Sequence, residues 1–354
     1  MPLLLGERQY AHSASLCYVA CDGNSVMTIP AEDMPKTILL DIYRRANLIF
    51  QSDEKFRTMI MGGDLQILYY SPRGQEILSA ALMAAVNPDD YLVTTYRGLH
   101  DQLAKGIPPR DLWAEFAGKA SGTCKGKGGP MHITHPETGV MVTTGIVGSG
   151  MPIANGLALA SQLEGDGKVT VVCFGDAATN IGAFHESLNM AQIWKLPVIF
   201  VCQNNLYGEH TPQAMSTGCK ELIDRAPAYG INAIQVNGND AFAMYAAAKA
   251  AVDRARAGDG PTFIEAKTFR FFGHLLGDDS HYIPAAEMAA AKAVDPVPAY
   301  RQALLDRLLA EAELDEIDAQ IAVIVEEAAA YALASVYPDA VEIRRDVLEE
   351  EIAA

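Results

Sequence analysis

The chain has 354 residues, 50% of them hydrophobic and 20% charged, which is enough apolar material for a globular core and argues against disorder. The formal net charge of −17 disfavours nucleic acid and anionic membranes as partners, because both carry negative charge. No apolar run reaches the roughly 18 residues of a membrane-spanning helix, and Glu7 and Arg8 interrupt the N-terminal apolar stretch too early for a signal peptide. We therefore expect a globular protein in the cytoplasm, with its six cysteines reduced. Only Cys17 and Cys21 are close in sequence, and nothing nearby completes a metal site.

The first part of the chain combines an irregular start with a helical region. Residues 1–36 show little periodicity and are expected to form an N-terminal arm that packs on another subunit. Apolar positions recur at helical spacing in residues 37–61, which predicts one or two helices. Residues 75–85 predict another helix, and residues 91–95 a short strand.

The middle of the chain predicts a parallel sheet. Residues 122–150 are dense in glycine and are expected to form a long functional loop. Beyond this loop, apolar strand-like runs alternate with helical ones, so we predict an α/β fold whose mostly parallel sheet is flanked by helices on both faces. The predicted strands are residues 168–174, 197–202, 233–236 and 261–268, and the predicted helices are residues 181–194 and 242–257.

The end of the chain, residues 297–354, is expected to form a helical tail that packs on the same α/β unit, which spans residues 37–296. An apolar stripe on this tail predicts a packing face. It consists of Leu304, Leu308, Ile317, Ile321 and Ile324.

Two polar motifs follow strands of the predicted sheet. GDAATN begins at Gly175, and QNNLYG begins at Gln203. If the two strands are neighbours, Asp176 and Asn205 meet at their carboxyl ends, where open α/β sheets bind ligands. Carboxylate and amide oxygens suit Mg²⁺ that also holds phosphate oxygens. Each motif alone is also typical of an ordinary strand end or turn, so the pair carries the prediction.

The stretch from residue 175 to residue 208 resembles the thiamine-diphosphate motif in the alpha subunits of 2-oxo acid dehydrogenases of the pyruvate and acetoin dehydrogenase type. The family pattern is Gly-Asp-Gly, a spacer of this length, and Asn-Asn. The resemblance implies that Asp176, Asn205 and the carbonyl of Tyr207 bind Mg²⁺, and that the backbone at Ala177 and Ala178 contacts the diphosphate. Ala177 departs from the pattern, because the family usually has glycine there. A methyl group fits at this position if φ is negative.

Other segments extend the resemblance to nearly everything after about residue 39. Tyr96 and Arg97 resemble the family's diphosphate-binding pair. The segment 125–132 resembles its glycine-rich loop. In the segment 145–156, Gly145 and the carbonyl of Val147 are implied to hold the aminopyrimidine ring. In the segment 269–282, which resembles the mobile active-site loop, Arg270 and His274 are implied to face the cofactor, with His274 as a proton donor.

Three positions bear on the substrate. Leu99 stands where the family commonly has histidine, and we expect it to make the pocket less polar. Leu275 stands where the mitochondrial pyruvate enzyme has a regulatory serine, so that switch is expected to be absent. The Gly-His-x-x-Gly-Asp pattern from Gly273 to Asp278 is more similar to acetoin dehydrogenase alpha subunits. The substrate, a small oxo compound, stays open between pyruvate, acetoin and others.

The resemblance also implies partners. The glutamate that activates thiamine lies on the beta chain in this family, and no segment here resembles it or a second, pyrimidine-binding domain. We therefore expect an active site at an alpha/beta interface in an α2β2 heterotetramer, with acyl transfer to a lipoyl-bearing acyltransferase. The alternatives are another transketolase-like thiamine enzyme and a non-catalytic assembly subunit. A nucleotide-binding oxidoreductase is disfavoured because no dinucleotide fingerprint follows a strand.

Overall fold

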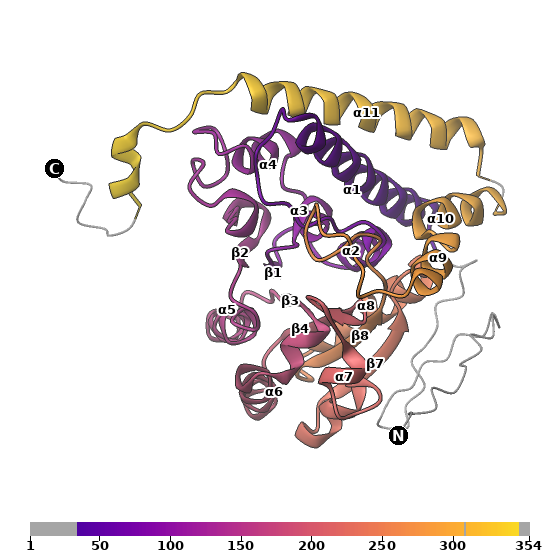
Figure 1. Cartoon of the computed structure of the whole chain (residues 1–354). Helices are drawn as coiled ribbons and strands as arrows, with labels where there is room; N and C mark the ends of the chain where they lie inside the picture. Colours follow the sequence, from indigo (N-terminus) through magenta and orange to yellow (C-terminus); the bar gives the residue numbers. More distant parts are fainter. Residues whose placement is uncertain (1–33, 308, 347–354) are drawn as a thin grey trace, which may run out of the picture.

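A computed structural model describes residues 34–307 and 309–346, in which one parallel sheet is covered by helices (Figure 1). Residues 1–33 of the predicted N-terminal arm, with the pair Cys17 and Cys21, lie outside these residues. The longer helices are α1 (Lys36–Gly62), α2 (Glu76–Ala84), α3 (Leu99–Lys105), α4 (Pro109–Phe116), α5 (Gly150–Glu164), α6 (Gly182–Trp194), α8 (Ala241–Arg256), α9 (Ala285–Ala293), α10 (Pro296–Leu305) and α11 (Glu311–Ala334). Short helical turns are η2 (Gly129–Met131), η3 (Pro136–Thr138), η4 (Asp176–Asn180), α7 (Gln213–Ser216), η5 (Leu222–Tyr229) and η6 (Ala340–Arg344).

The main sheet has six strands in the order β2-β1-β3-β4-β8-β7, and every neighbouring pair is parallel. Its strands are β1 (Tyr91–Thr95), β2 (Val140–Thr144), β3 (Thr170–Gly175), β4 (Val198–Asn204), β7 (Asn232–Asn237) and β8 (Thr262–Lys267). A small antiparallel pair, β5 (Tyr207–Gly208) and β6 (Thr211–Pro212), lies beyond the end of β4. After β1 the chain adds β2 on one side and β3 on the other, so the winding direction reverses beside β1. Ligands bind at such a reversal in open α/β sheets.

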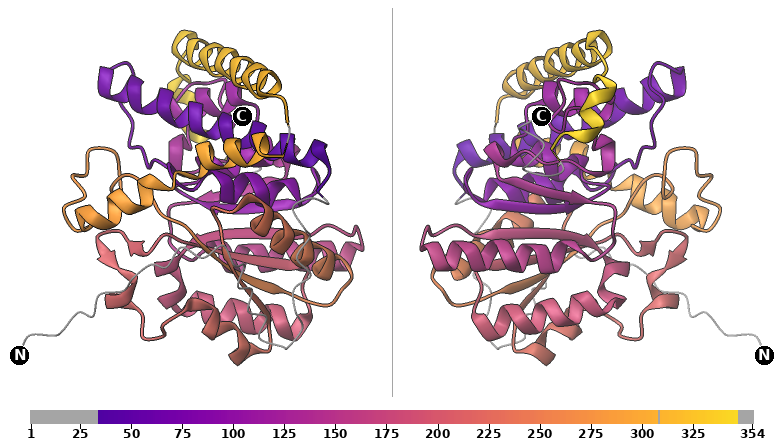
Figure 2. Two further views of the ribbon diagram at one scale, coloured as in Figure 1. Left: turned by 90° about the vertical axis from the view of Figure 1, so that its right-hand side faces the viewer. Right: turned by 90° about the vertical axis from the view of Figure 1, so that its left-hand side faces the viewer.

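Both faces of the sheet are buried, and Figure 2 shows the sheet between two helical layers. Along β3, Val171 and Cys173 join the core beneath α1, α2 and α8, whereas Val172 and Phe174 join the core beneath α5 and α6. This alternation explains the continuous apolar runs of residues 171–174 in β3 and 198–202 in β4, which are typical of parallel strands buried on both faces. The predicted fold class is confirmed.

The strands and helices predicted around the two motifs are confirmed, with ends shifted by up to two residues. The long loop predicted at residues 122–150 was only partly correct, because β2 lies inside it and pairs with β1. Helix α5 begins at Gly150 within the same glycine-rich stretch. A Cβ on Gly150 would approach Val93 to 3.1 Å and Val172 to 3.5 Å, so glycine lets the helix start close against the sheet. The sequence analysis did not predict α3, α4 and α5.

The C-terminal helix α11 packs along α1 and α4 and shares their core, and Figure 1 shows it crossing above α1. Leu304, Ile317 and Ile321 are buried as predicted. Ile324 was predicted wrongly, because its side chain faces solvent with 40% exposure. Leu308 lies outside the described residues. No helix in the described part of the chain combines the length and apolarity needed to cross a bilayer.

Candidate active site

A cavity of about 430 Å³ opens beyond the carboxyl ends of β1 to β4, beside the point where the winding direction reverses. Because β3 and β4 are paired in parallel, with Gly175 opposite Gln203, the two polar motifs end side by side. The segments that follow β1 and β2 supply the other wall. All the site residues predicted from the sequence line this one cavity: Tyr96, Arg97, Gly145, Val147, Asp176, Ala177, Ala178, Asn205, Tyr207, Arg270 and His274.

Asp176 is the first residue after β3 and is 2% exposed. Its Oδ2 atom is buried and has no hydrogen-bond partner among the described residues. Burial raises the pKa of this carboxyl to about 6, although its own backbone amide and Arg270 act in the opposite direction. A carboxylate oxygen left without a partner in a cavity is costly to the folded chain. It is therefore a suitable ligand for a cation.

Asn205 follows β4 and is held from two sides. Its amide nitrogen donates to Oε1 of Gln75 over 3.0 Å, and its Oδ1 accepts from the backbone N–H of Tyr207 over 3.3 Å. Between them Leu206 has a φ of 71°, a left-handed conformation that is uncommon for a residue with a side chain. This tight turn brings Asn205 and Tyr207 to the same cavity. An amide oxygen has two lone pairs, so Oδ1 can accept this bond and still bind a metal.

Ala177 does not have a positive φ, so its methyl group causes no backbone strain. Its side chain packs on Gly208, where an added Cβ would lie only 2.5 Å from the Cβ of Ala177. Gly208 in β5 thus leaves room for the methyl group of Ala177, which stands where the family usually has glycine. This departure is therefore compatible with the geometry of the loop.

Two buried arginines line the cavity without a carboxylate partner among the described residues. Arg97 donates to the carbonyl oxygens of Ser71 (2.8 Å) and His274 (2.7 Å). Arg270, which is 1% exposed, donates to the carbonyl of Glu209 and to the hydroxyl of Tyr282. Burial, together with the nearby Arg270, lowers the pKa of Arg97 to about 10. Two buried guanidinium groups with neutral partners create a local positive potential in an acidic protein, which favours an anion such as a phosphate.

His274 lies in the loop between β8 and α9, and its ring contacts Tyr70 and Tyr96 at centroid distances of 5.3 and 5.9 Å. Burial and the charges of Arg97 and Arg270 lower the pKa of His274 to about 4. The imidazole is therefore neutral at pH 7, and its Nδ1 atom has no hydrogen-bond partner in the part of the chain that the structure describes. His274 thus lines the same cavity as Asp176, Arg97 and Arg270, and its role there stays a prediction.

Asp278 holds this loop in shape. Its carboxylate accepts from the backbone N–H of His274 (2.6 Å), the backbone N–H of Ser280 (2.9 Å) and the hydroxyl of Tyr282 (2.7 Å). Burial acts to raise its pKa, but the hydrogen bonds from Ser280, Tyr282 and His274 outweigh it and lower the pKa to about 2. The carboxylate is thus charged across the physiological range and fixes His274 at the cavity.

A buried polar network under the cavity was not predicted. Asp101 in α3 accepts from Ser79 and Thr94, each over 2.5 Å, and from the amide nitrogen of Gln203 over 2.9 Å. Gln203 lines the cavity, and its oxygen lies 3.2 Å from Nε2 of His100. The network connects the end of β4 to α3 and fixes the floor of the site.

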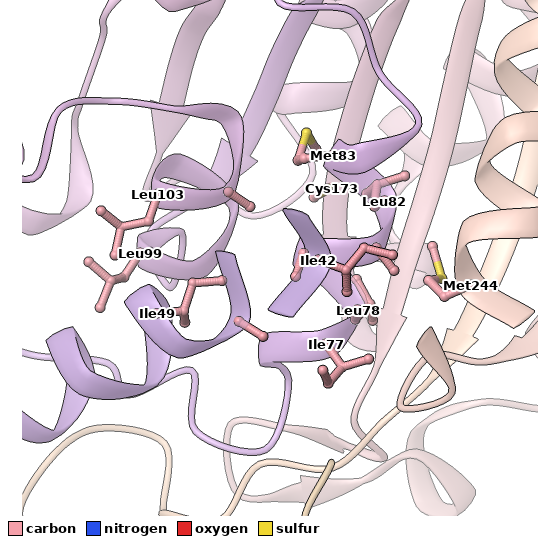
Figure 3. Close-up of a cluster of buried hydrophobic side chains, with 14 of the residues drawn as sticks. Ile42, Ile49, Ile77, Leu78, Leu82, Met83, Leu99, Leu103, Cys173 and Met244 are labelled. Atoms are coloured by element: carbon pink, nitrogen blue, oxygen red, sulfur yellow. The ribbon is translucent and has the colours of Figure 1, made fainter. Parts of the chain in front are cut away.

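The expectation that Leu99 lines the pocket was wrong. Leu99 is 2% exposed and belongs to the core between α1 and α3 (Figure 3). It starts α3, and the side chains that point to the cavity floor come from the following residues, His100 and Asp101. The residue at position 99 therefore does not determine the polarity of the cavity.

The glycine-rich loop is organised by Glu115, a second residue that sequence reasoning missed. The buried carboxylate accepts four backbone N–H groups, from Cys124 (2.7 Å), Gly126 (2.9 Å), Gly128 (2.8 Å) and Gly129 (3.0 Å). A Cβ on Gly128 would lie 1.8 Å from the carbonyl oxygen of His132, so the loop needs glycine there to wrap the carboxylate. The signal available in the sequence was an acidic residue just before a run of glycines.

A family model for the dehydrogenase E1 component matches residues 44–341. The chain belongs to this family. It is 37% identical over 316 residues to the alpha subunit of acetoin:2,6-dichlorophenolindophenol oxidoreductase from Cupriavidus necator. The aligned region covers 89% of this chain and 95% of the relative. It is 36% identical over 307 residues to the subunit of the same name from Bacillus subtilis, with 86% and 92% covered. The pyruvate dehydrogenase E1 alpha subunit of Porphyra purpurea is 34% identical over 321 residues, with 88% and 93% covered.

These comparisons confirm the resemblance stated from the sequence. The chain is an alpha subunit of the thiamine-diphosphate-dependent E1 dehydrogenases, which are oxidoreductases that act on oxo groups. Asp176 with its unpartnered oxygen and the two arginines with neutral partners fit a diphosphate held through a divalent cation. The described residues contain no group of three His, Cys, Asp or Glu side chains that could hold a metal. A site of one carboxylate, one amide and one carbonyl is not such a group.

Proposed function

We propose that the cavity binds thiamine diphosphate as its Mg²⁺ complex. Asp176, Asn205 and the carbonyl of Tyr207 hold the metal ion. The backbone at Ala177 and Ala178, with Tyr96 and Arg97, holds the diphosphate, and Gly145 and the Val147 carbonyl hold the aminopyrimidine. One observation carries the proposal: a buried, unpartnered carboxylate oxygen shares a cavity with buried arginines that have only neutral partners.

Bound thiamine diphosphate supplies an electron sink for the cleavage of a bond next to a carbonyl group. The chain's own residues do the rest. Arg97 and Arg270 provide positive potential, which acts strongly because both side chains are buried. His274 is neutral at pH 7 before an anion binds, and a bound diphosphate raises its pKa. Its imidazole then donates a hydrogen bond or a proton to the oxygen of the substrate.

The proposed substrate is a small oxo compound, with acetoin ahead of pyruvate. The Gly273 to Asp278 pattern supports acetoin, as do the printed names of two of the relatives above. Pyruvate remains the second candidate because relatives named as pyruvate dehydrogenase subunits match over similar lengths. We propose a lipoyl group on a partner acyltransferase as the acceptor. The reading as a non-catalytic assembly subunit loses support, because Gly208 accommodates Ala177 and Leu99 lies away from the cavity.

We propose that a beta subunit completes the site in an α2β2 heterotetramer. The only carboxylate other than Asp176 in the described lining is that of Glu209, which is exposed rather than enclosed. Beside the cavity mouth, Ile146 is 71% exposed and Val147 is 48% exposed. Exposed apolar side chains at a site are typical of a surface that a partner covers. We also propose a cytoplasmic location, since the four cysteines in the described residues form no disulfide.

Reduction of dichlorophenolindophenol tests this function. The chain, alone and with its co-expressed beta subunit, is supplied with thiamine diphosphate, Mg²⁺ and either acetoin or pyruvate. We expect dye reduction only by the complex and only with both cofactors, and a higher kcat/KM for acetoin. Full activity of the alpha chain alone contradicts the shared site. Activity that persists without thiamine diphosphate in the complex contradicts the proposed chemistry.

A further inference from the structure

A second cavity, of about 680 Å³, lies behind the glycine-rich loop. Four segments enclose it: the chain after α1 (residues 63–68), the end of α4 (residues 116–119), the loop at residues 128–132, and the end of the α11 region at Leu333 and Tyr337. It shares Met131 with the cofactor cavity but no other lining residue. Nothing in the proposed reaction uses this space.

The cavity contains an unneutralised cation. Lys119 is only 7% exposed, and its ammonium lies 3.8 Å above the ring of Tyr337. Among the described residues, no carboxylate and no hydrogen-bond acceptor pairs with its side chain. The lining has one acidic residue, Asp64, which is exposed and forms no ion pair with Lys119 in the described structure. An ammonium group that lies over an aromatic ring, with no acceptor among the described residues, keeps its N–H donors available to an anion that enters the cavity.

The other walls are mainly apolar. Leu65, Ile67, Phe116, Met131 and Leu333 line the cavity. The backbone N–H groups of Gly128 and Gly129 are already bonded to Glu115, so they offer no second anion site. The cavity therefore combines the single ammonium group of Lys119 with mainly apolar and aromatic walls. This combination matches a ligand with one negative charge and an apolar body.

We propose that this second cavity binds a small organic monocarboxylate, with the carboxylate on Lys119 and the apolar body against Phe116, Leu333 and Tyr337. The binding does not depend on the proposed function. The ligand would lie against His132, which also lines the second cavity. The ring of His132 is the nearest group to Gly145, because a Cβ added at Gly145 would lie 3.4 Å from it. A single layer of residues thus separates the carboxylate from the wall of the cofactor cavity.

The test uses the full chain and 4-fluorobenzoate, whose binding is followed by fluorine NMR line broadening, with the neutral 4-fluorobenzamide as a matched probe. We expect the acid to bind and the amide to bind far more weakly. Lys119→Met is expected to weaken binding of the acid on the order of tenfold to a hundredfold, since a charge-assisted hydrogen bond is lost. Lys220→Met, at an exposed lysine whose ammonium forms no ion pair with the described residues, is the control and is expected to leave binding unchanged.

A second variant keeps the proposal testable if Lys119→Met does not fold. Leu333→Trp places a larger side chain at a position that is 47% exposed, so the fold is expected to survive while the probe is excluded. Equal binding of the acid by the wild type and both variants overturns the proposal. So does displacement of the probe by pyrophosphate with no effect of Lys119→Met, because the probe is then at Arg97 and Arg270. Equal affinity for the acid and the amide also overturns it.

Discussion

Two buried carboxylates near the carboxyl end of the sheet have opposite surroundings. Asp101 is fully buried and accepts from Ser79, Thr94 and Gln203. Asp176 is almost as deeply buried, but one of its oxygens has no partner and its pKa is raised to about 6. Gln203 bridges the two regions, because it donates to Asp101 and lines the cavity of Asp176.

The difference separates a structural role from a binding role for the same chemical group. A buried carboxylate that is saturated by protein donors fixes the positions of those donors. One that lacks donors destabilises the free chain and gains its partner only when a ligand arrives. The contrast predicts that mutation of Asp101 impairs folding, whereas mutation of Asp176 impairs binding.

Asp101→Ala is expected to have the largest effect on stability. It leaves the hydroxyls of Ser79 and Thr94 and the amide of Gln203 without their acceptor in the interior. The free energy of unfolding is expected to fall by about 3 kcal/mol, as measured by urea denaturation of the full chain. Asp176→Ala is the matched variant and is expected to cost nothing or to stabilise. Equal losses for the two variants would remove the distinction between them.

Arg97→Met tests whether the positive potential of the cavity serves an anion. The guanidinium is buried with only carbonyl partners, and its pKa is lowered to about 10. Its removal is expected to weaken binding of magnesium pyrophosphate about a hundredfold, because a charge-assisted contact is lost. Calorimetry measures this change. Arg44→Met, at an exposed arginine on α1, serves as the control, and the same loss in both variants contradicts a local role of Arg97.

Gly208→Ala addresses the alanine that replaces the family's glycine. The new methyl group would lie 2.5 Å from the Cβ of Ala177, so the loop that carries Tyr207 must shift. A cost of about 1–3 kcal/mol is typical of such overpacking, and we expect pyrophosphate affinity to fall about tenfold. The double variant Gly208→Ala with Ala177→Gly removes the clash and is expected to recover most of the affinity. A double variant as weak as Gly208→Ala shows that this contact is not the cause.

The pH dependence of metal binding gives the smallest effect. Asp176 must lose its proton to bind Mg²⁺, and its pKa in the empty chain is about 6, above the usual 3.8. Magnesium pyrophosphate affinity is expected to change little above pH 7 and to fall by at most about tenfold per pH unit below pH 6. The free energy of unfolding depends on pH in the opposite direction. The raised pKa of Asp176 contributes its full stabilisation below pH 3.8, and this stabilisation is lost as the pH rises through about 6. Asp176→Asn is expected to abolish this dependence of stability on pH.

The parts of the fold and the site that could be predicted from sequence are those with local signals. Continuous apolar runs marked β3 and β4, and the polar motifs that follow them marked Asp176 and Asn205. Strand β2 and helix α5 were missed because glycine is frequent there, and glycine serves close approach to the sheet at Gly150 rather than a loop. Ile324 continued a helical stripe in sequence, but the face of α11 on which it lies is open to solvent.

Roles that depend on contacts between distant segments could not be predicted. Glu115 binds backbone groups nine to fourteen positions further on, and Asp101 binds Gln203, which is 102 positions away. Leu99 was misassigned for a related reason. The helix that it starts turns its side chain into the core, whereas the next two residues face the polar network. Only the packing of α3 against β1 and α1 decides which side chain faces the site.

The contrast between the two carboxylates is tested most directly by calorimetric titration of thiamine diphosphate with Mg²⁺ into the chain and its co-expressed beta subunit. Wild type is compared with Asp176→Ala, and the unfolding transition of each complex is recorded in parallel. We predict tight binding by the wild type, none by the variant, and a variant that is at least as stable as the wild type without cofactor. Equal binding by the two would contradict the central claim that the unpartnered carboxylate of Asp176 is the metal ligand of this site.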